Sequence, residues 1–303
     1  MNMEVAFSQR QRLRFIESVV FWEGAIDRPR VAKAFGVTEN HVTKDFGLYR
    51  KQFPGNLDYD LSHRSYRPGR KFRPRLTSGT AEEYLALLRV SREAAEGADG
   101  FESAVAPTVG DGVHVELIPA PIGRVDPSTL KDVTRALRQG TGLRIVYQSL
   151  QTRQATDREV WPHTLVFAGA RWHVRAFDSK YDDFIDLVLQ RIRKTVPTEN
   201  PAPKAAQDDM QWNQRVRVTL VPRADLSTEQ QEVIALEFGM ENIKGHWRWR
   251  ADVRECLVPY FLESMALGPN IAHLHPKLHL LETELLKTHS FPTSRRERSS
   301  STR

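Results

Sequence analysis

Apolar positions near the start of the chain follow the spacing of short amphipathic helices. Between Gln9 and Glu23, the side chains of Leu13, Ile16 and Val20 share one face, as they do in a helix with about 3.6 residues per turn. Asp27 then stands where a second helix would be capped, and the proline that follows it fits the first helical turn. The pattern therefore predicts two helices before residue 36.

A glycine turn at Gly36 and a third helix complete this pattern. Thr38 is a candidate N-cap, and Val42, Phe46 and Tyr49 are spaced to face a core. The polar residues in the first turns of this helix are left outside. A helix, a glycine-containing turn and another helix are typical of a helix-turn-helix. The alternative is an ordinary αα-hairpin with a solvated face.

The chain after the third helix predicts a basic wing. Leu57–Asp60 and Ser65–Arg67 are expected to form two short strands. From Ser62 to Leu76 there are six Lys or Arg residues and one His, with no acidic residue. A wing of this charge would lie along a phosphate backbone or in the minor groove. Beyond Pro68, a disordered basic linker is an equal alternative.

Positive charge is concentrated in the same part of the chain. Residues 1–80 hold 15 Lys or Arg and 8 Asp or Glu, a net of +7, whereas the remainder holds 29 and 30, a net of −1. This asymmetry indicates a polyanion-binding domain, with a solvated basic face as the alternative. Asn40 suits adenine, and Lys44 suits guanine or a phosphate. The side chains expected to contact DNA are those of Thr38, Asn40, His41, Thr43 and Lys44 in the third helix and of His63, Arg64 and Arg67 in the wing.

Short apolar runs in the middle of the chain predict mainly strands. After a helix expected from Thr80 to Ala95, a helix from Pro127 to Arg138 begins with proline and is followed by Gly140. Several short strands separated by glycine turns favour a small β-barrel. The predicted strands are Leu143–Tyr147, Leu165–Phe167, Trp172–Phe177 and Phe184–Ile192, with a hairpin between the second and the third.

The last third of the chain predicts a small α/β module. A strand from Arg215 to Val221 precedes a helix that starts near Ser227. Val253–Leu267 and Lys277–Lys287 both have helical spacing. Pro197–Asp209 is interpreted as an interdomain linker.

Four segments of the middle region resemble the WYL-domain transcriptional regulators. The triplet Trp172-His173-Val174 stands where the Trp-Tyr-Leu that names the family would be, and differs from it at two of three positions. The frame is most similar to the WYL repressors associated with phage-defence systems. With the winged helix and an extension from Gln214 to Lys287, the resemblance covers nearly the whole chain. The four segments are Ile145–Ser149, Trp161–His163, Arg171–Phe177 and Gln190–Ile192.

The resemblance implies an Sm/SH3-like β-barrel that senses a ligand, often a nucleotide or nucleic acid, and a C-terminal dimerisation module. Guanidinium groups bind phosphate in a bidentate fork, and aromatic rings stack on bases. The alternative is that Arg175 and Arg191 are exposed strand residues that form ion pairs with Asp178, Asp182 or Asp186. The pocket residues that the resemblance implies are Tyr147, Ser149, His163, Arg175, Phe184 and Arg191.

Two groups of side chains suggest other chemistry. Three aspartates suggest a metal-dependent nuclease, and three histidines approach metal-ligand spacing, but no further ligand is evident in either group. There is no glycine-rich phosphate loop and no marked nucleophile. We expect no catalysis, cofactor or metal; the alternatives are a nuclease or an accessory nucleic-acid-binding protein without regulatory output. The residues concerned are Asp182, Asp183, Asp186, His273, His275 and His279.

The chain also carries no sign of a membrane or an oxidising compartment. It has no run of about 18 apolar residues, its first residues lack the apolar core of a secretory signal, and Cys256 is its single cysteine. We therefore expect a cytoplasmic location.

These patterns, together with what the WYL resemblance implies, predict an α+β protein that is a homodimeric transcriptional repressor. It would bind an inverted-repeat operator in double-stranded DNA and respond to a nucleotide or single-stranded nucleic-acid effector. The expected divisions are a winged helix-turn-helix at 1–79, a linking helix and loop at 80–111, the WYL domain at 112–197, a linker at 198–211, the dimerisation module at 212–289 and a disordered tail at 290–303.

Overall fold

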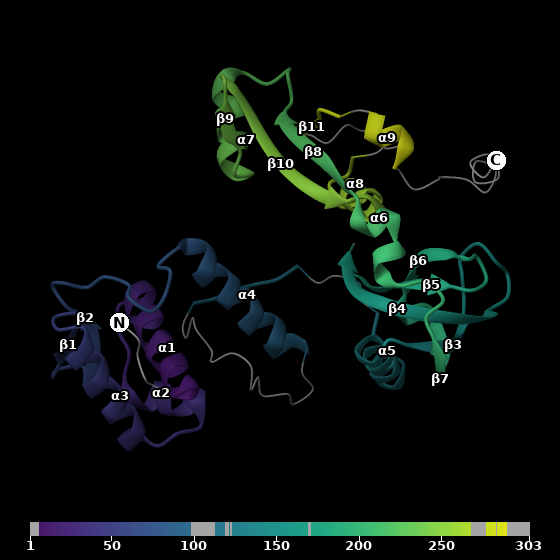
Figure 1. Ribbon diagram of the computed structural model, residues 1–303. Helices are drawn as coiled ribbons and strands as arrows, with labels where there is room; N and C mark the ends of the chain where they lie inside the picture. Colours follow the sequence, from purple (N-terminus) through teal and green to yellow (C-terminus); the bar gives the residue numbers. More distant parts are fainter. Residues whose placement is uncertain are drawn as a thin grey trace. The chain divides into compact units, whose positions relative to one another are not determined.

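The computed structural model describes residues 6–97, 113–118, 121, 123–168, 171–267, 277–282 and 284–289 (Figure 1). The chain falls into two compact units, one ending at residue 119 and the other beginning at residue 120. The tail predicted at 290–303, and most of the loop predicted before residue 112, lie outside the described residues.

The N-terminal unit is a winged helix-turn-helix. Its helices are α1 (Phe7–Glu23), α2 (Arg28–Phe35) and α3 (Glu39–Gln52), its wing is the antiparallel pair β1 (Leu57–Asp60) and β2 (Ser65–Pro68), and α4 (Ala81–Gly97) follows. The three helices, the wing and the later helix that the hydrophobic pattern predicts are thereby confirmed.

Local interactions fix where α2 and α3 begin. The Asp27 carboxylate accepts a hydrogen bond from the Arg30 N–H at 2.9 Å. Gly36 ends α2 with φ of 61°, a left-handed conformation that glycine adopts without strain. Thr38 occupies the predicted N-cap position of α3, but its hydroxyl lies 2.8 Å from Nδ1 of His41 instead of capping the backbone.

One apolar core joins the three helices to the wing. Leu13, Ile16, Val42 and Phe46 are fully buried. The Phe46 ring stacks on Tyr66 of β2, with ring centroids 3.7 Å apart. Because burial of apolar area is the main source of folding free energy, this packing fixes the wing to α3.

The chain beyond Pro68 is ordered as far as the described contacts reach, so the linker alternative is wrong. Asn56 brackets the backbone of Arg73, accepting from its N–H at 3.0 Å and donating to its carbonyl at 2.9 Å. The fully buried Glu17 accepts hydrogen bonds from the three N–H groups of residues 75–77 at 2.7–2.9 Å. The side chains of Glu17 in α1 and of Asn56, just before β1, therefore hold the basic segment in place.

The C-terminal unit begins with a five-stranded antiparallel sheet that has α5 packed on β3, β4 and β7. The pairing order is β6-β5-β4-β3-β7, and the hairpin predicted before Phe177 is the β4–β5 pair. No pairing among the described residues joins β6 to β7, so the sheet is open and the predicted barrel is not found. The elements are α5 (Pro127–Gln139), β3 (Thr141–Tyr147), β4 (Thr156–Ala168), β5 (Arg171–Asp178), β6 (Asp183–Val188) and β7 (Ile192–Pro201).

The same unit contains a second antiparallel sheet, with the order β11-β8-β10-β9. Its core includes the buried residues Val218, Leu220, Val258 and Leu262. The elements are α6 (Met210–Asn213), β8 (Arg215–Pro222), α7 (Thr228–Glu237), β9 (Glu241–Ile243), β10 (His246–Arg254), α8 (Val258–Ser264), β11 (Leu278–Leu280) and α9 (Glu284–Thr288).

Four predicted elements of this unit are wrong in type or extent. A 3-10 turn at Leu189–Arg191 divides the strand predicted at Phe184–Ile192. The helix predicted at Val253–Leu267 begins as the end of β10, and α8 is only its central part. The helix predicted at Lys277–Lys287 contains β11, where Leu278 and Leu280 are buried in the alternation of a strand. The predicted linker at 198–211 begins inside β7 and ends inside α6.

Candidate functional site

The first turns of α3 present a polar surface to solvent. All five residues predicted there, from Thr38 to Lys44, are exposed. Thr43 donates its hydroxyl to the Glu39 carbonyl at 2.9 Å. The side chains of Asn40 and Lys44 have no hydrogen bond or ion pair with any described residue. Their amide and ammonium groups therefore remain available for a partner.

A buried ion pair sets the position of α3 against α1. Asp45 is 1% exposed and receives Nε of Arg12 at 2.6 Å and Nε2 of Gln9 at 2.7 Å. Removing one member of a buried pair is strongly destabilising. The exposed turn of α3 is therefore presented from a rigid support.

The three predicted wing residues differ in whether they already form an ion pair within the protein. Asp60 accepts from Nδ1 of His63 at 3.0 Å and forms an ion pair with Nε of Arg67 at 3.1 Å. The hydrogen bond from the His63 backbone, aided by its side chain and by Arg67, lowers the pKa of Asp60. Arg64, at φ of 48°, has an exposed side chain without an ion pair among the described residues. Arg64 is therefore the freest cation of the three predicted wing contacts.

The ordered segment after the wing adds further positive charge. Four cations of this segment are exposed and have no ion pair among the residues that the structure describes. Sequence reasoning did not assign them to the site because it left the order of this segment open. They are Arg70, Lys71, Arg73 and Arg75.

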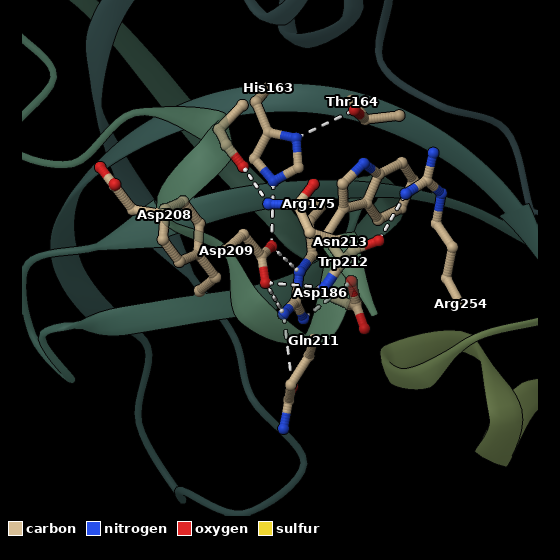
Figure 2. Close-up of polar contacts among 12 residues, drawn as sticks. His163, Thr164, Arg175, Asp186, Asp208, Asp209, Gln211, Trp212, Asn213 and Arg254 are labelled. Atoms are coloured by element: carbon tan, nitrogen blue, oxygen red, sulfur yellow. Dashed lines mark hydrogen bonds and ion pairs between the residues drawn. The ribbon is translucent and has the colours of Figure 1, made fainter. Parts of the chain in front are cut away.

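A second polar site lies on β5 and is centred on Arg175 (Figure 2). Arg175 is 3% exposed. Its Nε and Nη2 donate to the two carboxylate oxygens of Asp209 at 2.7 and 2.9 Å, and its Nη1 lies 3.4 Å from Asp186 of β6. The alternative of a strand ion pair is thus partly right, because Asp186 is one of the partners, but the closer partner is Asp209.

Aromatic rings surround this ion pair. His163 of β4 lies 3.1 Å from Asp209 through Nε2, and its ring makes T-shaped contacts with Phe184 and Trp212 at centroid distances of 5.6 and 5.4 Å. The guanidinium of Arg254 lies over the Trp212 ring, 4.1 Å from its centroid. The site thus combines aromatic rings with a guanidinium that can form two parallel hydrogen bonds. In this structure Asp209 already accepts both of those hydrogen bonds.

Burial and charge shift the pKa values here in opposite directions. Burial would lower the pKa of Arg175, but Asp209 and Asp186 raise it above its ordinary value, so the cation is permanent. Burial would raise the pKa of Asp209, but hydrogen bonds from Arg175 hold it below its ordinary value. Burial lowers the pKa of His163 despite the opposing effect of Asp209, which favours the neutral imidazole near neutral pH.

Three of the six predicted pocket residues meet at this site, and three do not. His163, Arg175 and Phe184 belong to the cluster around Asp209. The remaining three make other contacts: Tyr147 is buried and accepts from the Val188 N–H, Ser149 accepts from the Gln151 N–H, and Arg191 is half-buried without an ion pair among the described residues. Asp209, Trp212 and Arg254 were missed because no local pattern places them near β5.

The triplet at 172–174 divides between surface and interior. Trp172 is exposed beside Phe167, whereas His173 is 2% exposed and its ring makes a T-shaped contact with Tyr260 of α8. Burial, with the charges of Arg171 and Arg191, lowers the pKa of His173 to about 4.

The aspartates considered for a nuclease point to separate partners. Asp182 pairs with Lys204 at 3.2 Å, Asp183 accepts from the Phe184 N–H, and Asp186 faces Arg175. Within the described ranges, no group of three His, Cys, Asp or Glu side chains is placed to hold a metal ion. His273 and His275 lie outside those ranges. No described helix is long and apolar enough to cross a membrane.

Comparison with known proteins identifies the family. The chain is 30% identical over 275 residues to the DNA-binding transcriptional repressor CapW of Pseudomonas aeruginosa, and the match covers 90% of this chain and 87% of that protein. This chain belongs to the CapW family. CapW of Escherichia coli strain KTE188 is 29% identical over 274 residues (89% and 87% covered), and CapW of Stenotrophomonas maltophilia is 28% identical over 280 residues (90% and 90% covered).

Three family descriptions match successive parts of this CapW-family chain. Residues 8–90 match the BrxR transcriptional regulator winged helix-turn-helix domain, residues 128–197 match the WYL domain, and residues 215–286 match the BrxR transcriptional regulator C-terminal dimerization domain. The resemblance drawn from the sequence is thereby confirmed.

Proposed function

We propose that this protein is a transcriptional repressor that binds double-stranded DNA as a homodimer, probing the major groove with the first turns of α3. The observation that supports this is the exposed polar face of α3, on which Asn40 and Lys44 have no partner among the described residues and which a buried ion pair holds in a basic winged helix. Asn40 and Lys44 offer groups that suit base edges, and Arg64 offers a cation to the phosphate backbone. The relatives are named DNA-binding transcriptional repressors.

A mobility-shift titration on the DNA upstream of the gene tests this proposal. Asn40→Ala and Lys44→Ala should weaken operator binding by about 1–3 kcal/mol and change binding to random DNA less. Arg64→Ala should weaken binding to operator and to random DNA equally. Arg67→Ala should have a smaller effect, because Arg67 already forms an ion pair with Asp60. Lys51→Ala, a matched loss of charge in the last turn of α3, should bind like the unmodified protein.

Two results would contradict the proposal. Equal losses on operator and random DNA for Asn40→Ala and Lys44→Ala would reject α3 as the recognition helix. Absence of a specific footprint upstream of the gene would favour an accessory nucleic-acid-binding protein instead.

We also propose that an anionic effector, a nucleotide or a short single strand, binds the WYL domain and releases the repressor, and that the controlled genes form a phage-defence operon. What supports the site is the bidentate guanidinium of Arg175 beside His163 and Phe184. Arg191, which has no ion pair among the described residues, is the second proposed phosphate contact.

Induction in cells tests the effector site. Arg175→Lys with Arg191→Gln loses the bidentate fork and one cation, and should bind the operator normally but fail to release its promoter when the inducing signal arrives. Arg193→Gln, an exposed cation on β7, is the matched control and should respond normally. A folded double variant that still responds fully would reject this site as the sensor.

A further inference from the structure

The proposed phosphate-binding arginine already holds an anion supplied by its own chain. Asp209 is 1% exposed and meets Arg175 through both carboxylate oxygens, at 2.7 and 2.9 Å. This is the fork-to-fork geometry in which a guanidinium also binds a phosphate group. Asp209 does not belong to the five-stranded sheet; it precedes α6, in the segment that leads from β7 to β8. Figure 2 shows it between Arg175 and His163.

Charge makes this arrangement a poor receptor for a second anion. Arg175 faces two carboxylates, Asp209 and Asp186. The pKa of His163 is lowered by burial, so the imidazole adds no positive charge near neutral pH. An effector phosphate that entered beside Asp209 would meet like charge at short range in a buried site, which is unfavourable.

We propose that Asp209 is an internal ligand of the Arg175 site, which a phosphate group of the effector displaces when it binds. This inference rests on the proposed anionic effector and concerns how that effector acts. In the closed state Asp209 occupies the guanidinium of Arg175, and in the open state Asp209 has left it. The open state therefore has the higher affinity for the effector. Such a difference is what allows a ligand to shift a conformational equilibrium.

Displacement of Asp209 would act directly on the C-terminal part of the chain. Asp209 caps α6 by accepting from the Trp212 N–H at 3.0 Å. Trp212 in turn holds Arg254 of β10 through its ring and its carbonyl oxygen. The second carboxylate, Asp186, is also linked to this part of the chain, because it lies 3.4 Å from the Tyr260 hydroxyl of α8. Both anions at Arg175 are therefore tied to elements that carry or contact the second sheet.

The test replaces the carboxylate without removing the cap. Asp209→Asn keeps the size of the side chain and a residue that caps helices well, but removes the charge that fills the guanidinium. The control is Asp208→Asn, because the exposed Asp208 carboxylate accepts from the Ala205 N–H and does not contact Arg175. Calorimetry on the full-length protein would use two probes, metal-free adenosine triphosphate and a 5′-phosphorylated tetrathymidylate, which distinguish a free nucleotide from a short strand.

The internal-ligand proposal predicts that Asp209→Asn binds at least one probe about tenfold or more tightly than the unmodified protein, and that Asp208→Asn does not. Adding Arg175→Gln to Asp209→Asn should abolish the gain. Hydrogen exchange supplies a second readout: saturating the unmodified protein with that probe should speed exchange at the Trp212 and Asn213 amides. A purely structural ion pair would leave the exchange of these amides unchanged when the probe is added, even if the uncompensated guanidinium of Asp209→Asn attracts anions.

The proposal is overturned if Asp209→Asn binds both probes no more tightly than Asp208→Asn, or if the bound probe leaves exchange in α6 unchanged. These outcomes are separable from failure of the proposed function. If Asp209→Asn gains affinity and the probe speeds exchange in α6 but does not release operator DNA, the internal ligand stands and effector control of repression fails. If there is no gain while induction still depends on Arg175 and Arg191, effector control stands and the internal ligand fails.

Discussion

At the scale of single residues, His173 shows how burial changes chemistry. Its Nδ1 has no hydrogen-bond partner among the described residues, and its ring packs against Tyr260. Burial disfavours placing a charge in this contact, and the nearby cations Arg171 and Arg191 disfavour protonation of His173 further. The side chain that replaces the family's tyrosine therefore behaves as a neutral packing group near neutral pH.

This environment predicts a pH-dependent stability. The pKa of His173 is about 4 in the folded protein and about 6.5 in an unfolded chain, so between these values only the unfolded chain binds the proton. Its contribution to the free energy of unfolding is complete above pH 6.5 and is lost as the pH falls towards 4, by up to about 3 kcal/mol. Denaturant titrations at pH 7.5, 5.5 and 4.5 should show this loss, and His173→Phe should reduce it. An unchanged pH slope in His173→Phe would contradict the assignment.

Sequence identified some residues of the second site and missed others for a physical reason. His163, Arg175 and Phe184 lie on strands whose alternation and family resemblance are visible locally. Asp209 comes 34 residues after Arg175, within a proline- and alanine-rich segment that has the composition of a linker. Nothing in a local pattern indicates which buried cation a carboxylate in such a segment will meet.

At the scale of elements, features that depend on neighbouring residues in the sequence were predicted correctly, and features that depend on distant residues were not. The boundaries of α2 and α5 follow from a capping aspartate, a proline in the first turn and a glycine at the end. β11 was mistaken for helix because a three-residue strand is defined by its partner β8, not by its own periodicity. The open sheet was mistaken for a barrel because closure depends on whether β6 and β7 meet.

The segment after the wing gives an element-scale prediction. Glu17→Gln replaces one acceptor oxygen of a buried carboxylate that binds the Tyr49 hydroxyl and the N–H groups of residues 75–77. We expect the free energy of unfolding to fall by about 1–3 kcal/mol and the amides of residues 75–77 to exchange faster with solvent. The matched control Glu39→Gln, on an exposed side chain, should change neither. Normal exchange at residues 75–77 in Glu17→Gln would show that Glu17 is not what holds this segment.

At the scale of the whole molecule, the C-terminal module is expected to form the dimer. Truncation after residue 213 removes the part that matches a dimerization domain but keeps Asp209 and α6. Light scattering should then give a monomer, and operator affinity should fall because two recognition helices, set one helical turn of about 10 bp apart on an inverted repeat, no longer act together. A truncated protein that remains dimeric would place the main contact elsewhere.

The open central sheet has a further consequence for how these molecules associate. Exposed edge strands invite pairing with another chain, and proteins discourage this with proline and charge along the edge. β7 carries Arg193, Lys194, Pro197 and Pro201 as exposed residues along its length. The two prolines have no backbone N–H to donate to the strand of a neighbouring molecule, and the Arg and Lys side chains place positive charge on this edge. The edge therefore offers no continuous row of hydrogen-bonding groups. Growth of fibres or aggregates by strand addition at β7 is thereby disfavoured, even when the concentration of the protein is high.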